Sequence, residues 1–267
     1  MSLSIAAETL LLEGPDAAAF AHAQFSSKVD SLAIEQWQFS AWLDAKGRVR
    51  ALFHLARLDT QRYLLLLRGG EASAMAEALQ RFVFRSKLQF STQPGRILTT
   101  GAAQPMHAVS HNDDVTSLGC ATHSLDIATT RQPDHAWRLL QMRAGWPWLP
   151  SAARDVLLPA ALSLQRLDAV AVDKGCYPGQ EIVARLHFRG GHKRHLHRVT
   201  LSQRMAAGDV LHIENREVGC VLDVVSGDNR IEALVVLDDA LSVPADAIGA
   251  RIFNNHVTMK VEASWPA

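Results

Sequence analysis

Cysteine is scarce in this sequence, with only three residues, Cys120, Cys176 and Cys220, among 267. A small, odd number of cysteines cannot build a disulfide framework. Cysteines that stay reduced are typical of a reducing compartment, so we expect the protein to be cytoplasmic. The first residues also lack the basic segment and the apolar core of a secretory signal peptide, and none is expected.

Long apolar runs and an excess of one charge are missing as well. The longest apolar run, residues 63–67, is far too short to cross a bilayer, so no membrane partner is expected. Lysine and arginine number 27, and so do aspartate and glutamate. The chain as a whole is therefore not attracted to nucleic acid or to an anionic membrane, and any such contact must be local.

The common nucleotide and zinc motifs are absent too. The sequence has no GxxxxGK[ST] or GxGxxG loop, which argues against a phosphate cradle, and no HExxH or paired CxxC, which argues against zinc. Four histidines cluster at His187, His192, His195 and His197. Their spacing matches no known ligand pattern. We therefore favour a solvated start to a strand over a metal site, and no metal is predicted.

Apolar residues make up 48% of the chain, which is typical of a globular protein. The first two thirds of the chain mix predicted strands with predicted helices. We expect strands at 9–12, 36–43, 49–58, 62–67 and 88–91, helices opening at 14–16 and spanning 71–84, and weak strands over 92–132. A further helix follows Asp134, with Trp137, Leu140 and Ala144 on one face. This mixture indicates α+β lobes with largely antiparallel sheet.

After residue 192 the pattern changes to short strands at close spacing. We expect strands at 196–201, 210–213, 217–225, 231–237 and 257–261. Turn residues separate them, as in a small antiparallel barrel. The predicted fold class is therefore α+β, with two α+β lobes in residues 1–191 and a C-terminal antiparallel β-barrel domain in residues 192–267.

The stretch DKGCYPGQE, residues 173–181, carries the densest chemistry of the chain. Pro178 fits the first position of a helix, where its missing N–H costs nothing. Gln180 and Glu181 would then lie in the first turn, where an acidic side chain suits the helix dipole. Gly190 and Gly191 are expected to end that helix.

Cys176 is the candidate functional residue of this stretch. It precedes the predicted helix N-terminus and lies two residues after Lys174, and both neighbours favour a thiolate. We therefore predict a thiol more acidic than that of a free cysteine. The alternative interpretation is a small buried hydrophobic residue, which is common for cysteine. The polar, glycine-rich surroundings favour the first interpretation without deciding between them.

Two further features allow either a structural or a functional interpretation. The pair Trp146 and Trp148 flanks a proline and belongs either to an ordinary core or to an aromatic wall for a flat ligand. A basic run follows the stretch 173–181 and contains Arg185, Arg189, Lys193, Arg194 and Arg198. It is either a solvated surface or a local site for an acidic ligand tail or RNA phosphates.

The segment KGCYPGQE, residues 174–181, resembles the signature of the YgfZ family, which is related by fold to the T-protein (aminomethyltransferase) of the glycine cleavage system. Shorter segments elsewhere are similar to that family as well. They are LEGPD at 12–16, KGR at 46–48, RAGWP at 143–147, LP at 158–159, VAR at 183–185, FRG at 188–190 and KR at 193–194. The resemblance therefore covers nearly the whole chain.

The resemblance implies a three-lobed T-protein-like fold in which the two α+β lobes interleave. It also implies a tetrahydrofolate-binding accessory protein that supports assembly or repair of iron–sulfur clusters, including those of tRNA-modifying enzymes, with Cys176 as the functional thiol. Its partners would be a folate and iron–sulfur proteins or assembly factors, with an indirect link to tRNA.

The resemblance also implies that the folate lies in a central cavity between the lobes. Trp146 or Trp148 would stack on its rings, and Arg143 or Arg185 would meet its polar groups, since arginine pairs well with carboxylates. The remaining candidates, which shape the signature loop beside the folate, are Lys174, Tyr177, Gln180 and Glu181.

Several positions depart from the patterns of the relatives. T-proteins carry two aspartates where this chain has Ala51 and Leu52, so a general acid or base is missing. Within the YgfZ pattern, the usual Gln, Asn and Glu are here Ala160, Ser163 and Arg143. Aminomethyl transfer is therefore the alternative function, and a third alternative is an inherited fold without folate affinity.

Overall fold

A computed structural model describes residues 6–112, 114–130, 134–227, 230–241, 251–253 and 256–266 of the chain. It divides into two compact units. Unit 1 comprises the described residues of Met1–Leu43, Arg50–Trp137 and Asp168–Pro178, and unit 2 those of Asp44–Val49, Arg138–Leu167 and Gly179–Ala267. Both units are discontinuous in sequence. The predicted division at residue 191 stays a prediction.

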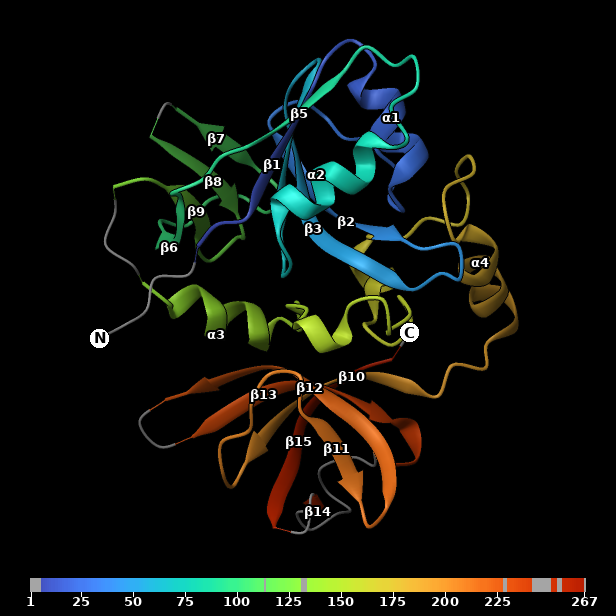
Figure 1. The fold of residues 1–267 in the computed structure, drawn as a ribbon. Helices are drawn as coiled ribbons and strands as arrows, with labels where there is room; N and C mark the ends of the chain where they lie inside the picture. The colour runs from blue at the N-terminus through green and yellow to red at the C-terminus, as the bar shows by residue number, and fades with distance from the viewer. Residues whose placement is uncertain are drawn as a thin grey trace. The chain divides into compact units, whose positions relative to one another are not determined.

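Unit 1 contains a five-stranded sheet in the order β2-β3-β4-β1-β5 (Figure 1). Its strands are β1 (Thr9–Glu13), β2 (Gln36–Leu43), β3 (Val49–Asp59), β4 (Arg62–Leu67) and β5 (Gln89–Thr92). β1 pairs antiparallel with both β4 and β5, and β3 pairs antiparallel with β4. All five strands were predicted from their apolar patterns to within about two residues at each end.

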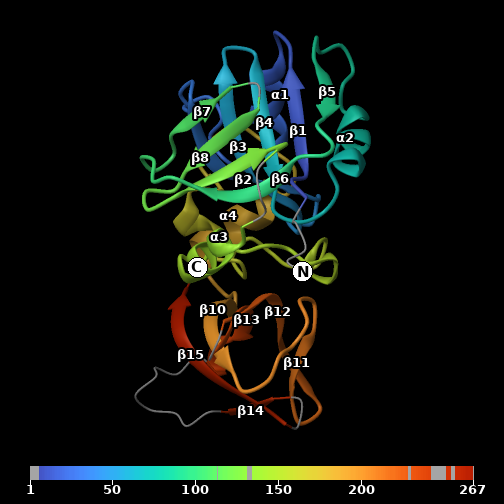
Figure 2. The same cartoon turned by 90° about the vertical axis from the view of Figure 1, so that its left-hand side faces the viewer.

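Two helices, α1 (Ala17–Gln24) and α2 (Ala72–Gln80), share one apolar core with this sheet, and Figure 2 shows them beside it. Phe20 and Phe25 from the α1 region and Met75 and Leu79 of α2 are buried in that core. α2 ends at Gln80 and not at residue 84 as predicted. Three of the next four residues, Phe82, Val83 and Phe84, are poor helix formers, since aromatic and β-branched side chains lose rotamer freedom in a helix.

A four-stranded sheet in the order β6-β9-β8-β7 completes unit 1. Its strands are β6 (Ile97–Gly101), β7 (Val109–His111), β8 (Val115–Gly119) and β9 (Ser124–Ala128). Only weak strands were expected here, yet β9 is buried along its whole length. The indole of Trp37 in β2 donates to the carbonyl of Gly119, 2.9 Å away, and so connects the two sheets.

Unit 2 contains a six-stranded sheet in the order β11-β12-β13-β10-β15-β14. Its strands are β10 (Arg194–Leu201), β11 (Val210–Ile213), β12 (Arg216–Ser226), β13 (Ile231–Asp238), β14 (Arg251–Phe253) and β15 (Val257–Trp265). The sequence indicated all of them except β14. The residues between Leu241 and β14 lie outside the described part of the chain.

The predicted antiparallel barrel is not confirmed in the described part of the chain. The end strands β11 and β14 approach each other but are not hydrogen-bonded among the described residues, so the sheet is not closed. These strands have only four and three residues, so each offers few backbone groups for pairing. Strand spacing predicts how many strands there are, whereas closure depends on pairing between the ends of the sheet. The fold is thus mixed α/β with few helices and several antiparallel sheets.

The other helices are α3 (Ala136–Arg143) and α4 (Gln180–Arg189), with short 3-10 turns at Ser151–Ala153, Leu164–Leu167 and Asp239–Leu241. α3 was predicted to bury Trp137, Leu140 and Ala144. Trp137 is buried, but Leu140 and Ala144 are exposed, and Gln141 and Met142 are buried in their place. The buried face is therefore rotated from the predicted one. No helix in the described part of the chain is long and apolar enough to cross a bilayer.

Candidate functional site

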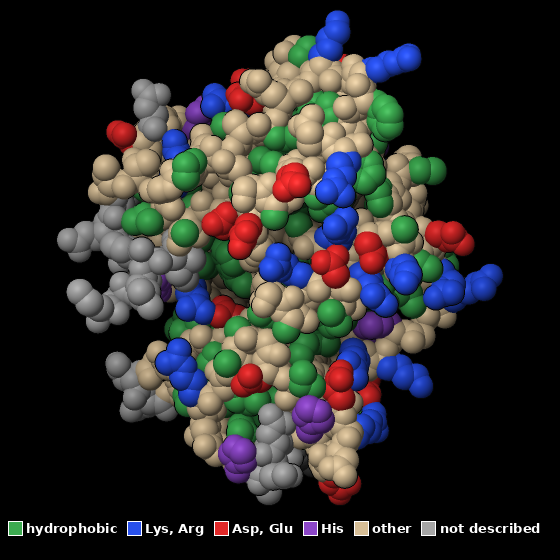
Figure 3. All heavy atoms as spheres, in the orientation of Figure 1, with side chains coloured by type: hydrophobic (Ala, Val, Ile, Leu, Met, Phe, Trp, Pro, Cys, Tyr) green, Lys and Arg blue, Asp and Glu red, His purple; other side chains and the backbone are tan. Residues whose placement is uncertain are grey.

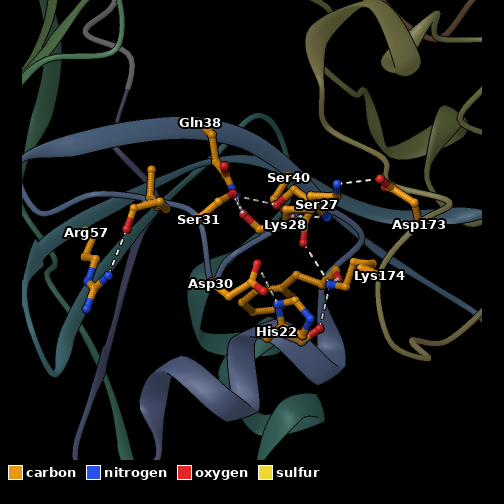
Figure 4. Close-up of polar contacts among 12 residues, drawn as sticks. His22, Ser27, Lys28, Asp30, Ser31, Gln38, Ser40, Arg57, Asp173 and Lys174 are labelled. Carbon is orange, nitrogen blue, oxygen red and sulfur yellow. Dashed lines mark hydrogen bonds and ion pairs between the residues drawn. The ribbon is translucent and has the colours of Figure 1, made fainter.

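The segment leading into the signature is tied to the end of α1 within unit 1. The hydroxyl of Ser26 donates to the carbonyl of Ala169 at 2.6 Å, and the backbone N–H of Ala171 donates to the carbonyl of Ser26 at 2.8 Å. The ammonium of Lys28 pairs with Asp173 at 2.5 Å (Figure 4), and this bond lowers the pKa of Asp173. Two backbone segments that are distant in sequence are thus held in fixed register.

Lys174 makes the most concentrated contact in this region. Its ammonium donates to the carbonyls of His22, Phe25 and Ser27 at 2.6, 2.7 and 2.8 Å, as Figure 4 shows in part. A lysine ammonium has three donors and no acceptor, so these three carbonyls match its full donor set. Burial lowers the pKa of Lys174 to about 8.

Tyr177 completes the anchor of the loop. Its ring lies 5.1 Å from the ammonium of Lys174, and its hydroxyl donates to the carbonyl of Ala171 at 2.8 Å. The side chain is buried, and this burial raises its pKa above the usual range. Lys174 and Tyr177 are therefore both parts of the loop's support.

Cys176 lies between these two anchored residues and is exposed, as is Gly175. The interpretation of Cys176 as a buried hydrophobic residue is therefore wrong. The predicted acidity of its thiol stays a prediction. That prediction counted Lys174 as a neighbour that favours the thiolate. In the structure, the ammonium of Lys174 binds three carbonyls, which belong to the α1 region and not to the signature loop.

The start of α4 differs from the prediction by two residues. The helix begins at Gln180, with Gly179 as its N-cap in the left-handed conformation (φ 79°), so Pro178 is not the first helical residue. Such a φ favours glycine at this position. The predicted first-turn position of Glu181 is confirmed, and so is the end of the helix at Gly190.

Gly179 also meets the turn between β2 and β3 at very short range within unit 2. A Cβ atom built on Gly179 would lie 2.5 Å from the carbonyl oxygen of Asp44 and 2.7 Å from the Cα of Gly47. A Cβ on Gly47 would in turn lie 3.0 Å from the Cβ of Ile182. The two glycines thus permit a backbone-to-backbone contact that no larger residue allows.

The other predicted site residues belong to unit 2, whereas the residues of the anchored loop belong to unit 1. Arg143 pairs with the buried carboxylate of Glu232, with its Nε 3.3 Å from Oε2. Arg198 reaches the same carboxylate at 3.2 Å. The bond from Arg143, followed by the charge of Arg198, lowers the pKa of Glu232. The guanidinium of Arg143 therefore contributes to the internal packing of unit 2.

Trp146 is buried and Trp148 is half-buried, while Arg185 and Glu181 are exposed on α4. Gln180, Glu181 and Arg185 share that helix. Arg185 has no acidic partner among the described residues. The assignment of these residues, with Lys174, Tyr177 and Arg143, to a folate site stays a prediction.

Sequence reasoning missed the supporting residues Ser26, Lys28 and Glu232. The signal for the first two was a short polar run, SSK, between two apolar residues, since buried hydroxyls usually have hydrogen-bond partners. Nothing in the pattern of β13 distinguished Glu232. The positions that depart from T-proteins, Ala51 and Leu52, are both buried in β3.

The three cysteines have different environments. Cys120 is buried and Cys220 is half-buried in β12. Burial raises the pKa of Cys120 to about 12 and that of Cys220 to about 11. Across the described ranges, no group of three or more histidine, cysteine or acidic residues is arranged to hold a metal ion.

Comparison with known proteins gives one consistent likeness. No family model matches the chain. It is 26% identical to the tRNA-modifying protein YgfZ of Sodalis glossinidius, with 90% of this chain and 87% of the relative covered. It is also 26% identical to the protein of that name from Blochmanniella pennsylvanica, with 88% and 86% covered. An uncharacterized protein of Haemophilus influenzae is 25% identical, with 85% of each chain covered.

The glycine cleavage system aminomethyltransferase T of Bartonella henselae superposes with a TM-score of 0.72. That match covers 97% of this chain and 84% of the other at 17% identity, so it establishes the fold alone. The predicted resemblance to YgfZ proteins and to the T-protein fold is confirmed.

The contact of Gly179 predicts a graded response to alanine substitution. Gly179→Ala should lower the free energy of unfolding by at least about 2 kcal/mol, because it adds a backbone clash to a left-handed φ. Gly190→Ala has open space, but its φ of 65° and ψ of −154° lie in a region that is nearly restricted to glycine, so it should cost about 1–3 kcal/mol from backbone strain alone. Gly175→Ala, with open space and no positive φ, should change stability by less than about 0.5 kcal/mol. Urea unfolding measures all three, and equal effects would contradict the backbone contact.

The anchor of the loop predicts unequal roles for two lysines. Lys174→Met should lower the free energy of unfolding by about 2 kcal/mol or more, since three carbonyls lose a charged donor. Lys28→Met serves as the matched control and should have little effect, because its pair with Asp173 is solvent-exposed. Thermal unfolding, with limited proteolysis of the segment 168–178, tests this difference. An equally large effect of Lys28→Met would overturn the assignment.

Exposure predicts the order of alkylation of the cysteines. At pH 8, pKa values of about 11 and 12 leave no more than about one part in a thousand of Cys220 and Cys120 as thiolate. Iodoacetamide should therefore label Cys176 first, as followed by mass spectrometry. Raising the pH to 10 should speed labelling of Cys220 about tenfold per pH unit. Equal rates for all three cysteines at pH 8 would show that burial does not protect the other two.

Proposed function

We propose that this protein is a tetrahydrofolate-binding accessory protein that supports assembly or repair of iron–sulfur clusters, including those of tRNA-modifying enzymes, with Cys176 as its functional thiol. One observation carries the proposal. A loop held by the three hydrogen bonds of Lys174 presents an exposed cysteine, and its residues are those of the YgfZ-like signature. The relatives named tRNA-modifying protein YgfZ support the link to tRNA modification.

The anchored loop suits a thiol that must act on another molecule. Its support lies in the backbone and in buried contacts, which leaves the thiol free to react without loss of packing. Cys176 has Gly175 on one side, where no described atom lies within 4 Å of an added Cβ. A partner or ligand can therefore approach the backbone at this point closely.

Residues of unit 2 fit the chemistry of a folate. A folate carries a flat ring system and a glutamate with two carboxylates, and when bound it supplies a one-carbon carrier. Arg185 is exposed and has no acidic partner in the described part of the chain, so its guanidinium is able to bind a carboxylate. Trp148 is half-buried and supplies an aromatic face. Arg143, already paired with Glu232, is the weaker candidate for the ligand.

Aminomethyl transfer is the second candidate, because the fold matches that of a T-protein. Ala51 and Leu52 weigh against it. Both are buried and apolar, so neither supplies the acid or base that a transfer step needs. The first function is therefore preferred.

The role of Cys176 is tested by complementation. In a strain lacking the gene, the wild-type protein should restore iron–sulfur enzyme activity, and Cys176→Ala should not. Thermal unfolding of Cys176→Ala should match the wild type, since one exposed loop thiol leaves no cavity. Cys220→Ala is the control and should restore activity. Full rescue by Cys176→Ala would show that the thiol is not the functional group.

Two further measurements separate the alternatives. Calorimetry with tetrahydrofolate should show binding, whereas an inherited fold without folate affinity would give no heat. A glycine-cleavage exchange assay with tetrahydrofolate should give no turnover. Robust turnover would establish the transferase in place of the accessory protein.

A further inference from the structure

The last turn of α4 and the residues after it expose an aromatic ring among cations. Phe188 is 75% exposed. Arg189 follows it, and Lys193 lies four residues further on, and both are exposed. The ring of His187 meets the ring of Phe188 edge-on, with centroids 4.9 Å apart. We call Phe188, Arg189 and Lys193 the α4 surface.

The charges of this surface are not neutralised. Residues 182–198 contain five arginines and lysines and no acidic residue, although the whole chain is neutral. Arg194 pairs with Glu217, and Arg198 pairs with Glu232. In the part of the chain that the structure describes, Arg189 and Lys193 have no such partner. Figure 3 shows lysine and arginine side chains gathered over α4 at the right-hand edge of the molecule.

The position of Arg189 has a structural explanation, but the exposure of Phe188 does not. A cation at a helix C-terminus interacts favourably with the helix dipole, which accounts for Arg189. A phenylalanine gains nothing from water contact, and α4 buries Val183 on its other side. Gly190 and Gly191 follow, and an added Cβ on either would meet no described atom within 4 Å.

We propose that the α4 surface binds single-stranded RNA, with the ring of Phe188 stacked on a base and with Arg189 and Lys193 on phosphates. An exposed aromatic ring among cations is the usual combination for single strands, because every base has a flat face. In a double strand the bases are stacked inside, so Phe188 would lack a partner. An acidic peptide would use the cations but not the ring. This binding goes beyond the proposed function and does not depend on folate.

The test is fluorescence anisotropy of the full-length protein with a short labelled oligouridylate. Phe188→Ala should weaken binding roughly 5- to 150-fold, the range for loss of one stacked base. The double variant Arg189→Ala, Lys193→Ala should weaken binding and flatten the salt dependence. For a single strand, two neutralised phosphates contribute about −1.4 to the slope of log affinity against log salt concentration, and the double variant should lose this contribution.

Two control variants match these changes. Arg204→Ala removes an exposed cation of unit 2 that follows the far end of β10, an eight-residue strand about 26 Å long. Phe84→Ala removes the most exposed phenylalanine of unit 1, which is 93% exposed. Both should bind the oligouridylate as the wild type does. Arg185 is left unchanged because it is the folate candidate.

The outcomes separate the proposals. Unchanged affinity of Phe188→Ala, equal losses in the two controls, or equal binding of a polyglutamate peptide would each overturn RNA binding at this surface. No binding of the wild type at about 50 mM salt would overturn it as well. Calorimetry of Phe188→Ala with tetrahydrofolate shows whether the folate proposal fails separately, since this variant leaves the folate candidates in place.

Discussion

The ammonium of Lys174 is the contact on which the geometry of the signature loop depends. A partly buried charge is unfavourable unless its donors are satisfied, and the carbonyls of His22, Phe25 and Ser27 satisfy them. Carbonyls at the end of a helix lack partners within the helix and carry the negative end of its dipole. One lysine thus meets two needs: it binds carbonyls in the last turn of α1 and in the residues after it, and it fixes the loop that carries Cys176. The thiol is exposed next to Gly175, between the anchored side chains of Lys174 and Tyr177.

The cations of unit 2 divide into two groups with different surroundings. Arg138, Arg143 and Arg198 pair with the carboxylates of Asp223 and Glu232 on the six-stranded sheet. Those carboxylates are largely buried, so salt screens the pairs less than it screens exposed ones. Among the residues that the structure describes, the cations of the α4 surface have no such partners, and they are exposed. A chain with no net charge can therefore still present a locally positive surface.

Much of this structure could be predicted from the sequence. The features that depend on contacts with backbone atoms far away in the sequence could not. The apolar patterns of β2, β4 and β11 located these strands to the residue, and Gly190 correctly marked the end of α4. Pro178 was placed in the helix because its local preference fits there, whereas the helix begins at Gln180, after Gly179 in the left-handed conformation. The acceptors of Lys174 are backbone carbonyls of ordinary residues, which no residue pattern reveals. Closure of the six-stranded sheet likewise depends on how its ends meet.

The contact between Gly47 and Gly179 also affects the order in which the chain assembles. About 130 residues separate the two glycines, and unit 2 includes both the early turn and the late helix. At a synthesis rate of 5–20 residues per second, the turn waits roughly 7 to 26 s for its counterpart to leave the ribosome. Unit 1 waits as well, because it includes Asp168–Pro178. Unit 1 is not complete until two thirds of the chain has been made, and unit 2, which includes Gly179–Ala267, is completed later still, so native folding of both is a late event in synthesis.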